Sequence, residues 1–159
     1  MNYTQSQTSS AQIPTVGNDA IEILVNDHQR IKQLLGQLTD GPQAQRTSTL
    51  EALKETLTVH NATEENLIYP AIREIAGRKM HSSELYHETA EADVALWQLS
   101  MMSPTDDTFA STATKARDAI EKHISSEEES EFPHLRDSAD TTQQQTLTSK
   151  VKQFRDRFH

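Results

Sequence analysis

The sequence predicts an all-α protein: an up-down-up-down four-helix bundle followed by a short C-terminal fifth helix. The chain has 159 residues, the length of one domain, and its four Gly and five Pro are too few for a turn-rich β fold. Apolar residues recur every three or four positions through four long segments. The short connections between these segments favour antiparallel neighbours. We expect a disordered polar tail at residues 1–17, the bundle at residues 18–136 and the fifth helix, packed on the bundle, at residues 141–158.

The composition excludes several classes of protein and of site. Because the chain has no Cys, it cannot form a disulfide, a thiolate metal site or a cysteine nucleophile. A formal net charge of −9 argues against a nucleic-acid or anionic-membrane partner, which clustered Lys and Arg would bind. No apolar run approaches the roughly 20 residues that span a bilayer, and the N-terminus lacks the pattern of a secretion signal. We therefore expect a cytoplasmic protein with neither a nucleic-acid nor a membrane partner.

The first predicted helix follows an N-cap at Asn18 or Asp19 and ends at Gly41-Pro42. Its apolar positions have helical spacing, and a histidine stands in the middle of them. The stripe consists of Ile21, Leu24, Val25, His28, Ile31, Leu35 and Leu38. We expect this face, His28 included, to point into the bundle.

The second predicted helix begins near Thr47 or Ser48 and continues to Gly77. Pro70 falls inside it and should kink it, because proline removes a backbone donor and clashes with the preceding turn. Its buried stripe again contains polar residues: Leu50, Leu53, Leu57, His60, Glu64, Leu67, Ala71 and Ile75.

The remaining helices are predicted from the same spacing. The third begins near Ser82 and ends before Ser103-Pro104, with Ser83, His87, Ala90, Val94, Trp97 and Met101 along one face. The fourth follows a capping cluster at residues 105–107 and ends near Pro133, with Phe109, Ala113, Ala116, Ile120, His123 and Glu127 facing inward. The fifth has a narrow stripe of Leu147, Val151, Phe154 and Phe158.

A motif in the second helix is repeated in the fourth. His60-x-x-x-Glu64 continues through a second Glu to Tyr69-Pro70, and His123-x-x-x-Glu127 continues through a second Glu to Phe132-Pro133. Both follow the pattern H-x-x-x-E-E-x-x-x-[YF]-P, and a lone histidine, His28 or His87, lies on the helix before each. The repeat indicates two helix hairpins that face each other across a pseudo-twofold axis.

These residue types at this spacing predict a metal site. Positions i and i+4 lie on one helix face about one turn apart, so each His and its Glu can reach the same ion. An ionised carboxylate on an apolar stripe needs compensation, which a divalent cation provides. We predict two metals that share Glu64, Glu127 and one solvent-derived oxygen and leave about one of six octahedral positions open on each.

The predicted ligands are His28, His60, Glu64, His87, His123 and Glu127. The alternative for any one of these histidines is that it is an ordinary hydrogen-bonded core residue. Imidazole and carboxylate suit iron or manganese, and zinc less distinctively.

Several neighbouring residues allow two interpretations. Tyr69 is a possible additional ligand, but an ideal helix places it on the far side from His60, so only the kink at Pro70 could bring its phenolate to the metal; local helix distortions do recur at functional sites. Asp27, Glu65 and Glu128 are either solvated or acceptors for a ligand N–H. Glu91 is a surface residue or the end of a third His-x-x-x-Glu. We expect His81, His134 and His159 at the surface.

The motifs taken together resemble the hemerythrin-like family, the HHE cation-binding domain, over residues 20–135. The resemblance rests on Asn26-Asp27-His28, the two H-x-x-x-E-E motifs and Tyr86-His87-Glu88. It implies a non-heme di-iron centre with Glu64 and Glu127 as bridging carboxylates and an oxo or hydroxo bridge. A ferritin-like centre is the structural alternative, but of its Glu-x-x-His motifs only Glu84-x-x-His87 and Glu131-x-x-His134 are present, and Pro133 interrupts the second.

The sequence also departs from oxygen-carrying hemerythrins. They have a further His where this chain has Ser83, and a bridging Asp where it has Glu128. The resemblance therefore implies a protein that binds O2, H2O2 or NO for oxygen, redox or iron sensing or handling, rather than a simple oxygen carrier. The alternatives are a catalase-like enzyme that degrades hydrogen peroxide and a nitrosative-stress or iron-handling protein without turnover; no catalytic residue is assigned.

Overall fold

The computed structural model describes residues 15–158, and this part of the chain is helical without strands. Most of the predicted polar tail, residues 1–14, and His159 lie outside the described residues. Within residues 15–158, no helix has the length and apolar character needed to cross a membrane.

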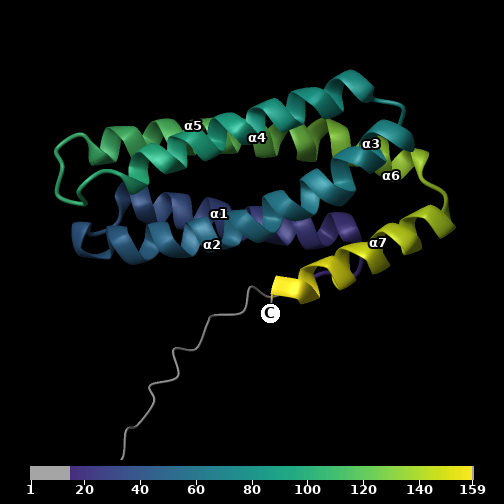
Figure 1. Cartoon of the computed structure of the whole chain (residues 1–159), viewed down its shortest axis with the longest axis horizontal. Helices are drawn as coiled ribbons and strands as arrows, with labels where there is room; N and C mark the ends of the chain where they lie inside the picture. The colour runs from purple at the N-terminus through teal and green to yellow at the C-terminus, as the bar shows by residue number, and fades with distance from the viewer. Residues whose placement is uncertain (1–14, 159) are drawn as a thin grey trace, which may run out of the picture.

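Four antiparallel helical segments form the bundle (Figure 1). The first is α1 (Ala20–Asp40). The second comprises α2 (Arg46–Thr63), the π-helical turn η2 (Glu64–Ile68) and α3 (Tyr69–Glu74). The third is α4 (Lys79–Ser100), and the fourth comprises α5 (Phe109–Ser126), the π-helical turn η3 (Glu127–Glu131) and α6 (Phe132–Ser138). Helix α1 contacts α2 and α5, and α4 contacts α5 and α3, which confirms the predicted fold class.

Local signals in the sequence set the ends of the helices. The Asp19 side chain accepts a hydrogen bond from the Glu22 N–H and caps α1. A 3₁₀ turn, η1 (Gln43–Gln45), leads from Gly41-Pro42 into α2. Gly77, with φ of 68°, lies in the left-handed region that glycine tolerates and turns the chain from α3 toward α4.

The repeated motif takes the same unusual backbone form in both halves of the bundle. Each α-helix changes to a π-helical turn at the glutamate of His-x-x-x-Glu, and the next α-helix starts at the aromatic residue before proline. Because Pro70 and Pro133 then lie in the first turn of a new helix, their missing N–H costs little. The predicted end of the fourth helix near Pro133 is therefore wrong, since the chain stays helical to Ser138.

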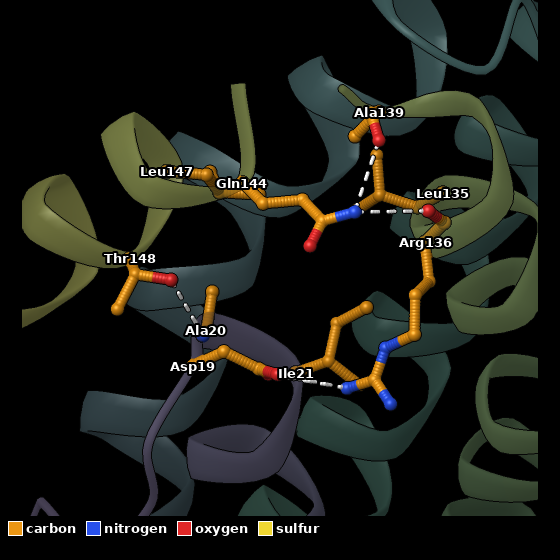
Figure 2. Close-up of a pocket in the computed structure, with 9 residues that line it drawn as sticks. All are labelled: Asp19, Ala20, Ile21, Leu135, Arg136, Ala139, Gln144, Leu147 and Thr148. Carbon is orange, nitrogen blue, oxygen red and sulfur yellow. Dashed lines mark hydrogen bonds and ion pairs between the residues drawn. The ribbon is translucent and has the colours of Figure 1, made fainter. Parts of the chain in front are cut away.

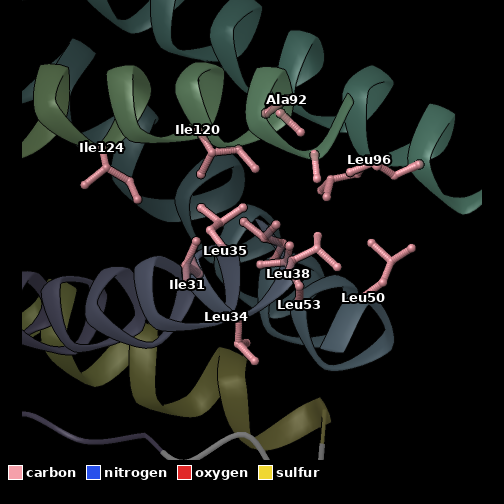
Figure 3. Packing of buried hydrophobic residues seen from close by; sticks show 14 of the residues in the cluster. Ile31, Leu34, Leu35, Leu38, Leu50, Leu53, Ala92, Leu96, Ile120 and Ile124 are labelled. Atoms are coloured by element: carbon pink, nitrogen blue, oxygen red, sulfur yellow. The ribbon is translucent and has the colours of Figure 1, made fainter. Parts of the chain in front are cut away.

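Two apolar clusters fill the bundle, one on each side of a layer of polar residues. Toward the α1–α2 and α4–α5 loops, leucine and isoleucine side chains from four helices interlock (Figure 3). Toward the other end, Leu24, Ile68, Tyr69, Ile72 and Phe132 belong to a second cluster. Along the chain, the polar residues His28, Glu64 and Glu127 each stand between a residue of one cluster and a residue of the other: Leu24 and Ile31, Leu57 and Ile68, and Ile124 and Phe132.

The predicted inner face of the third helix is wrong. Helix α4 buries Ser82, Leu85, Thr89, Ala92, Leu96 and Leu99, whereas every residue of the predicted stripe is exposed, with Trp97 at 63%. Both sets have steps of three and four residues, so periodicity alone does not choose between them. The buried set contains three leucines, and it provides the larger continuous apolar surface for the core.

The C-terminal helix α7 (Thr141–Arg155) packs against the bundle, and η4 (Asp156–Phe158) follows it. Leu147 and Val151 join the second apolar cluster. At the start of α1, the Thr148 hydroxyl accepts a hydrogen bond from the Ala20 N–H at 3.1 Å, and Arg136 pairs with Asp19 (Figure 2). The predicted stripe of α7 is only partly right: Phe158 is exposed, and the next fully buried side chain after Val151 is that of Arg155.

Candidate metal centre

Five of the six predicted ligands meet in the layer between the apolar clusters. His28 comes from α1, His60 from α2, Glu64 from η2, His123 from α5 and Glu127 from η3. All five are buried, and none exceeds 5% exposure. Ligand atoms of His28, His60, Glu64 and Glu127 lie within 4.8 Å of one another.

The cluster has two halves, and each glutamate presents one oxygen to each half. In the first half, His28 Nε2 and His60 Nε2 lie 3.7 and 3.1 Å from Glu64 Oε1. His28 Nε2 also lies 3.2 Å from Glu127 Oε2. In the second half, His123 Nε2 is 3.3 Å from Glu127 Oε1 and 3.9 Å from Glu64 Oε2. This arrangement suits two cations that share both carboxylates.

Several inward-facing atoms of the cluster have no hydrogen-bond partner among the described residues. They are His28 Nε2, Glu64 Oε1 and both carboxylate oxygens of Glu127. A buried polar atom without a partner is costly and needs an explanation. Electron pairs of imidazole and carboxylate directed into one small volume fit divalent cations, so these residues suit the metal that the motif predicted.

Tyr69 reaches the second half of the cluster because of the π-helical turn. Its backbone N–H bonds to the Glu64 carbonyl five residues earlier, so Tyr69 follows Glu64 by one wide turn on the same face. Its hydroxyl donates to Glu64 Oε2 at 2.9 Å and lies 3.0 Å from Thr89 Oγ1 and 3.1 Å from His123 Nε2. The π turn, and not the predicted kink at Pro70, supplies the required distortion.

In the other half of the pseudo-symmetric motif, Phe132 takes the place of Tyr69. Its N–H bonds to the Glu127 carbonyl, and its ring stacks on His28 with centroids 5.8 Å apart. Phenylalanine has no hydroxyl to offer a metal. The two halves therefore differ: one presents two imidazoles, and the other presents one imidazole and a phenol.

Each clustered histidine bonds to a carboxylate through its second ring nitrogen. His28 Nδ1 donates to Glu128 at 2.8 Å, and His60 Nδ1 lies 3.2 Å from Asp27. His123 Nδ1 lies 3.0 Å from Glu88. Such contacts fix ring orientation and make Nε2 the atom available to a metal. Glu65 has no such role among the described contacts; its backbone carbonyl accepts a hydrogen bond from Tyr86.

The glutamates change the proton affinities of the site in the metal-free protein. Burial alone would lower the pKa of His123, but its contacts with Glu127 and Glu64 raise it to about 11. Burial likewise opposes the charged forms of His28 and His60, yet nearby carboxylates raise both pKa values. Burial would raise the pKa of Glu64, but the charge of His60 and the surrounding histidine hydrogen bonds hold it well below its usual range. Burial and then the charges of Glu64 and Glu127 raise the pKa of the Tyr69 hydroxyl well above 10.

The structure does not bring His87 into the cluster. Its side chain is 76% exposed and lies 3.3 Å from Glu91 on the outer face of α4. Two residues further along, Thr89 is buried and its hydroxyl contacts Tyr69. Tyr69 and Thr89 thus lie beside His123, where a histidine from α4 had been predicted.

We expect His87→Ala to leave the metal content unchanged, because the exposed imidazole has no contact with the cluster. His123→Ala should lower the content, since it removes the imidazole of the second half. Metal analysis of the two purified variants against the unsubstituted protein checks both statements. Equal losses of metal in the two variants would contradict the position of His87 outside the cluster.

Three residues at the site were absent from the predicted set: Glu88, Thr89 and Arg155. Thr89 could have been found, because it continues the step pattern of Leu85, Ala92 and Leu96. Glu88 and Arg155 act across 35 and 128 residues of sequence. No local pattern indicates contacts of that range. The predicted surface positions of His81 and His134 agree with the structure.

Comparison with known proteins gives a family and a fold. The sequence matches the family described as Hemerythrin HHE cation binding domain over residues 19–135. A solved structure of a hemerythrin HHE cation binding domain-containing protein from Mycobacterium kansasii superposes with a TM-score of 0.74. At 20% identity, covering 89% of this chain and 90% of that one, this likeness shows the shared fold.

A curated relative from Nostoc sp. (strain PCC 7120) is 24% identical over 132 residues and is described as a DNA nickase. The match includes 82% of this chain but only 37% of the relative. The printed activity describes that longer protein. The family match spans most of the chain and contains all the clustered histidines and glutamates, so the chain belongs to the hemerythrin HHE cation-binding domain family.

Proposed function

We propose that the buried cluster holds two iron ions and that the protein binds dioxygen or a related small oxidant there. The observation that carries the proposal is the placement of Glu64 and Glu127, each with one oxygen toward each half of the cluster. One cation in the first half would leave Glu127 Oε1 buried without a partner and Glu64 Oε2 with only the Tyr69 hydroxyl. Two cations account for all four oxygens, and nitrogen and oxygen donors without sulfur suit iron.

The two ions would have different kinds of ligand. His28 and His60 would serve one ion, and His123 with the Tyr69 oxygen would serve the other, both glutamates bridging the pair. Each ion would then have about four protein donors out of six octahedral positions. The positions left over can accept solvent and a small oxidant. Bound iron would supply the electrons for binding or reducing that oxidant.

The surrounding residues prepare the site for a small ligand. Apolar side chains above and below the cluster, among them Ile68, Ile124 and Phe132, keep bulk water away. The carboxylates of Asp27, Glu88 and Glu128 hold the imidazole rings in place from outside. In the metal-free protein, the Tyr69 hydroxyl keeps its proton and donates a hydrogen bond to Glu64 Oε2.

A second candidate function is the breakdown of hydrogen peroxide, and the asymmetry of the cluster favours it. The half that contains His123 has one imidazole and a phenol, and a phenol that keeps its proton and does not bind metal can donate a hydrogen bond to peroxide. In that case the ion of this half has fewer protein donors than the other ion and is more open to substrate. Oxygen evolution from peroxide by the iron-loaded protein, and its loss in His123→Ala, would distinguish turnover from binding alone.

Metal quantification together with an optical spectrum tests the proposed function. Protein produced in iron-rich medium should contain about two iron ions per chain, the number that the two halves accept. Anaerobic reduction followed by exposure to oxygen should restore the same visible spectrum. A chain that takes up far less than two metals would overturn the proposal.

Tyr69→Phe should abolish a visible phenolate-to-iron band while leaving most of the iron bound, because it removes one oxygen donor and preserves the ring. Tyr86→Phe is the matched control. Tyr86 packs against Tyr69 with ring centroids 4.9 Å apart, but its hydroxyl bonds to the Glu65 carbonyl, away from the cluster. Absorption spectra of the two iron-loaded variants decide the matter. If the band survives in Tyr69→Phe, Tyr69 is not a ligand.

A further inference from the structure

A buried arginine of the C-terminal helix is connected to a histidine of the metal cluster. Arg155, at the end of α7, is fully buried. Its Nη1 donates to Asp27 Oδ2 at 2.6 Å and its Nη2 donates to Asp27 Oδ1 at 3.0 Å. The same Oδ2 lies 3.2 Å from His60 Nδ1, and His60 Nε2 lies 3.1 Å from Glu64 Oε1. Four side chains thus form a continuous buried chain from α7 to a bridging glutamate.

The other two histidines of the cluster are supported differently. Glu128, which accepts from His28, is 30% exposed, and the exposed Lys32 lies 3.5 Å from it. Glu88, beside His123, is 20% exposed. Water can solvate and partly screen these two carboxylates. Asp27 is 7% exposed, so water screens it less, and the buried Arg155 is its charged partner.

A buried carboxylate with one oxygen shared between two donors has little freedom to rotate. The two-pronged contact of Arg155 fixes the plane of Asp27, because a guanidinium matches a carboxylate with two parallel N–H bonds. Arg155 lies outside residues 19–135, the region that matches the family. The contact is therefore contributed by a segment that follows the matched domain.

We propose that Arg155 is a positioning residue for the metal centre, acting through Asp27 to orient His60 and to set how strongly His60 binds metal. The inference rests on the proposed metal-binding function of the cluster. By holding Asp27, Arg155 keeps His60 Nδ1 bonded outward and Nε2 directed at Glu64. Helix α7 is then a part of the site rather than a cover for the bundle.

Variants at Arg155 test the role, with binding of Co²⁺ or Fe²⁺ as the measurement. Arg155→Met removes the charge and both donors, and should weaken one of the two metal-binding steps by about 10–100-fold, the usual effect of losing an outer partner of a ligand. Arg155→Lys keeps the charge but not the two-pronged contact, and should lie between Met and Arg. Arg157→Met is the matched control, since Arg157 is exposed and its guanidinium lies over Phe154.

A second variant keeps the test decisive if Arg155→Met fails to fold. Asp27→Asn combined with Arg155→Met removes both buried charges and retains an acceptor oxygen for His60 Nδ1. This double variant should fold and still bind the affected metal more weakly, with a changed Co²⁺ absorption spectrum. Arg157→Met should match the unsubstituted protein in affinity and spectrum.

The outcomes separate this inference from the proposed function. If the unsubstituted protein binds no metal, the proposed function fails. If it binds two metals, and a folded Arg155→Met or double variant binds them with unchanged affinity and spectrum, Arg155 has only a structural role and the inference is overturned. A selective loss in one binding step with a shifted spectrum supports it.

Discussion

Replacing Glu127 with Gln should reduce the metal content from about two ions per chain to one or fewer. Each oxygen of Glu127 faces a different half of the cluster, so both ions lose a charged ligand at once. An amide offers one weaker oxygen and a nitrogen that does not bind metal. The loss of affinity should exceed the roughly 10–100-fold that removal of an outer partner costs. Metal analysis and competition with a chelator measure it.

A second bridging variant and an exposed control variant test this prediction further. Glu64→Gln should cause a similar loss, because Glu64 also presents one oxygen to each half. Glu129→Gln, in the same π-helical turn but exposed, should leave metal content unchanged. Loss of only one ion in either bridging variant, with normal affinity for the other, would show that the carboxylate does not bridge.

The helices were predictable because their signals are local. Asp19 caps α1, Gly41-Pro42 ends it, and the three- and four-residue steps of Leu, Ile and Ala mark the buried faces of α1, α2 and α5. The family resemblance was confirmed for the same reason, since each His-x-x-x-Glu pair is read within a single turn of helix.

The face of α4 was mistaken because two stripes compete on that helix. One contains Leu85, Ala92 and Leu96, and the other contains His87, Val94 and Trp97. A histidine was expected on α4 by analogy with α1, and this expectation favoured the second stripe. Leucine content would have favoured the first, and would have placed Thr89 at the cluster.

Tyr69 was predicted as a possible ligand but could not be placed, because ideal α-helical geometry sets it opposite His60. The π-helical turn, which begins at Glu64 and ends before Tyr69-Pro70, shifts the phase of the helix by one residue. The contacts of Arg155 and Glu88 depend on how distant helices pack. Local periodicity contains no information on such contacts.

The metal-free protein should lose stability as the pH rises from about 6.5 toward 9, whereas the metal-loaded protein should not. Burial opposes the charged imidazoles, but nearby carboxylates raise the pKa of His28, of His60 and, to about 11, of His123 above the unfolded value of about 6.5; for His60 these carboxylates are Glu64 and Asp27. A group whose folded pKa is raised stabilises the protein fully below its unfolded pKa, and this contribution declines as pH rises toward the folded pKa. For His123 this contribution falls throughout the window, and the contributions of His28 and His60 decline in the same direction.

The contribution of Glu64 to stability changes with pH in the opposite direction, and it limits the stability of the metal-free protein at low pH. Its folded pKa is lowered, so its contribution is present above the unfolded pKa of about 4.5 and is lost as the pH falls. The metal-free protein should therefore be most stable between about pH 4.5 and 6.5.

A bound metal requires neutral imidazoles and competes with protons, so the stability of the metal-loaded protein relative to the metal-free protein increases as the pH rises. Thermal unfolding at pH 6, 7.5 and 9, with and without metal, should show a difference in Tm that widens with pH. In the metal-free series, His123→Gln should make the decline shallower and the exposed His87→Ala should not. A metal-free Tm that stays level or rises over this range would contradict the prediction. It would mean that the clustered histidines are neutral when the site is empty and that the carboxylates take up the protons instead.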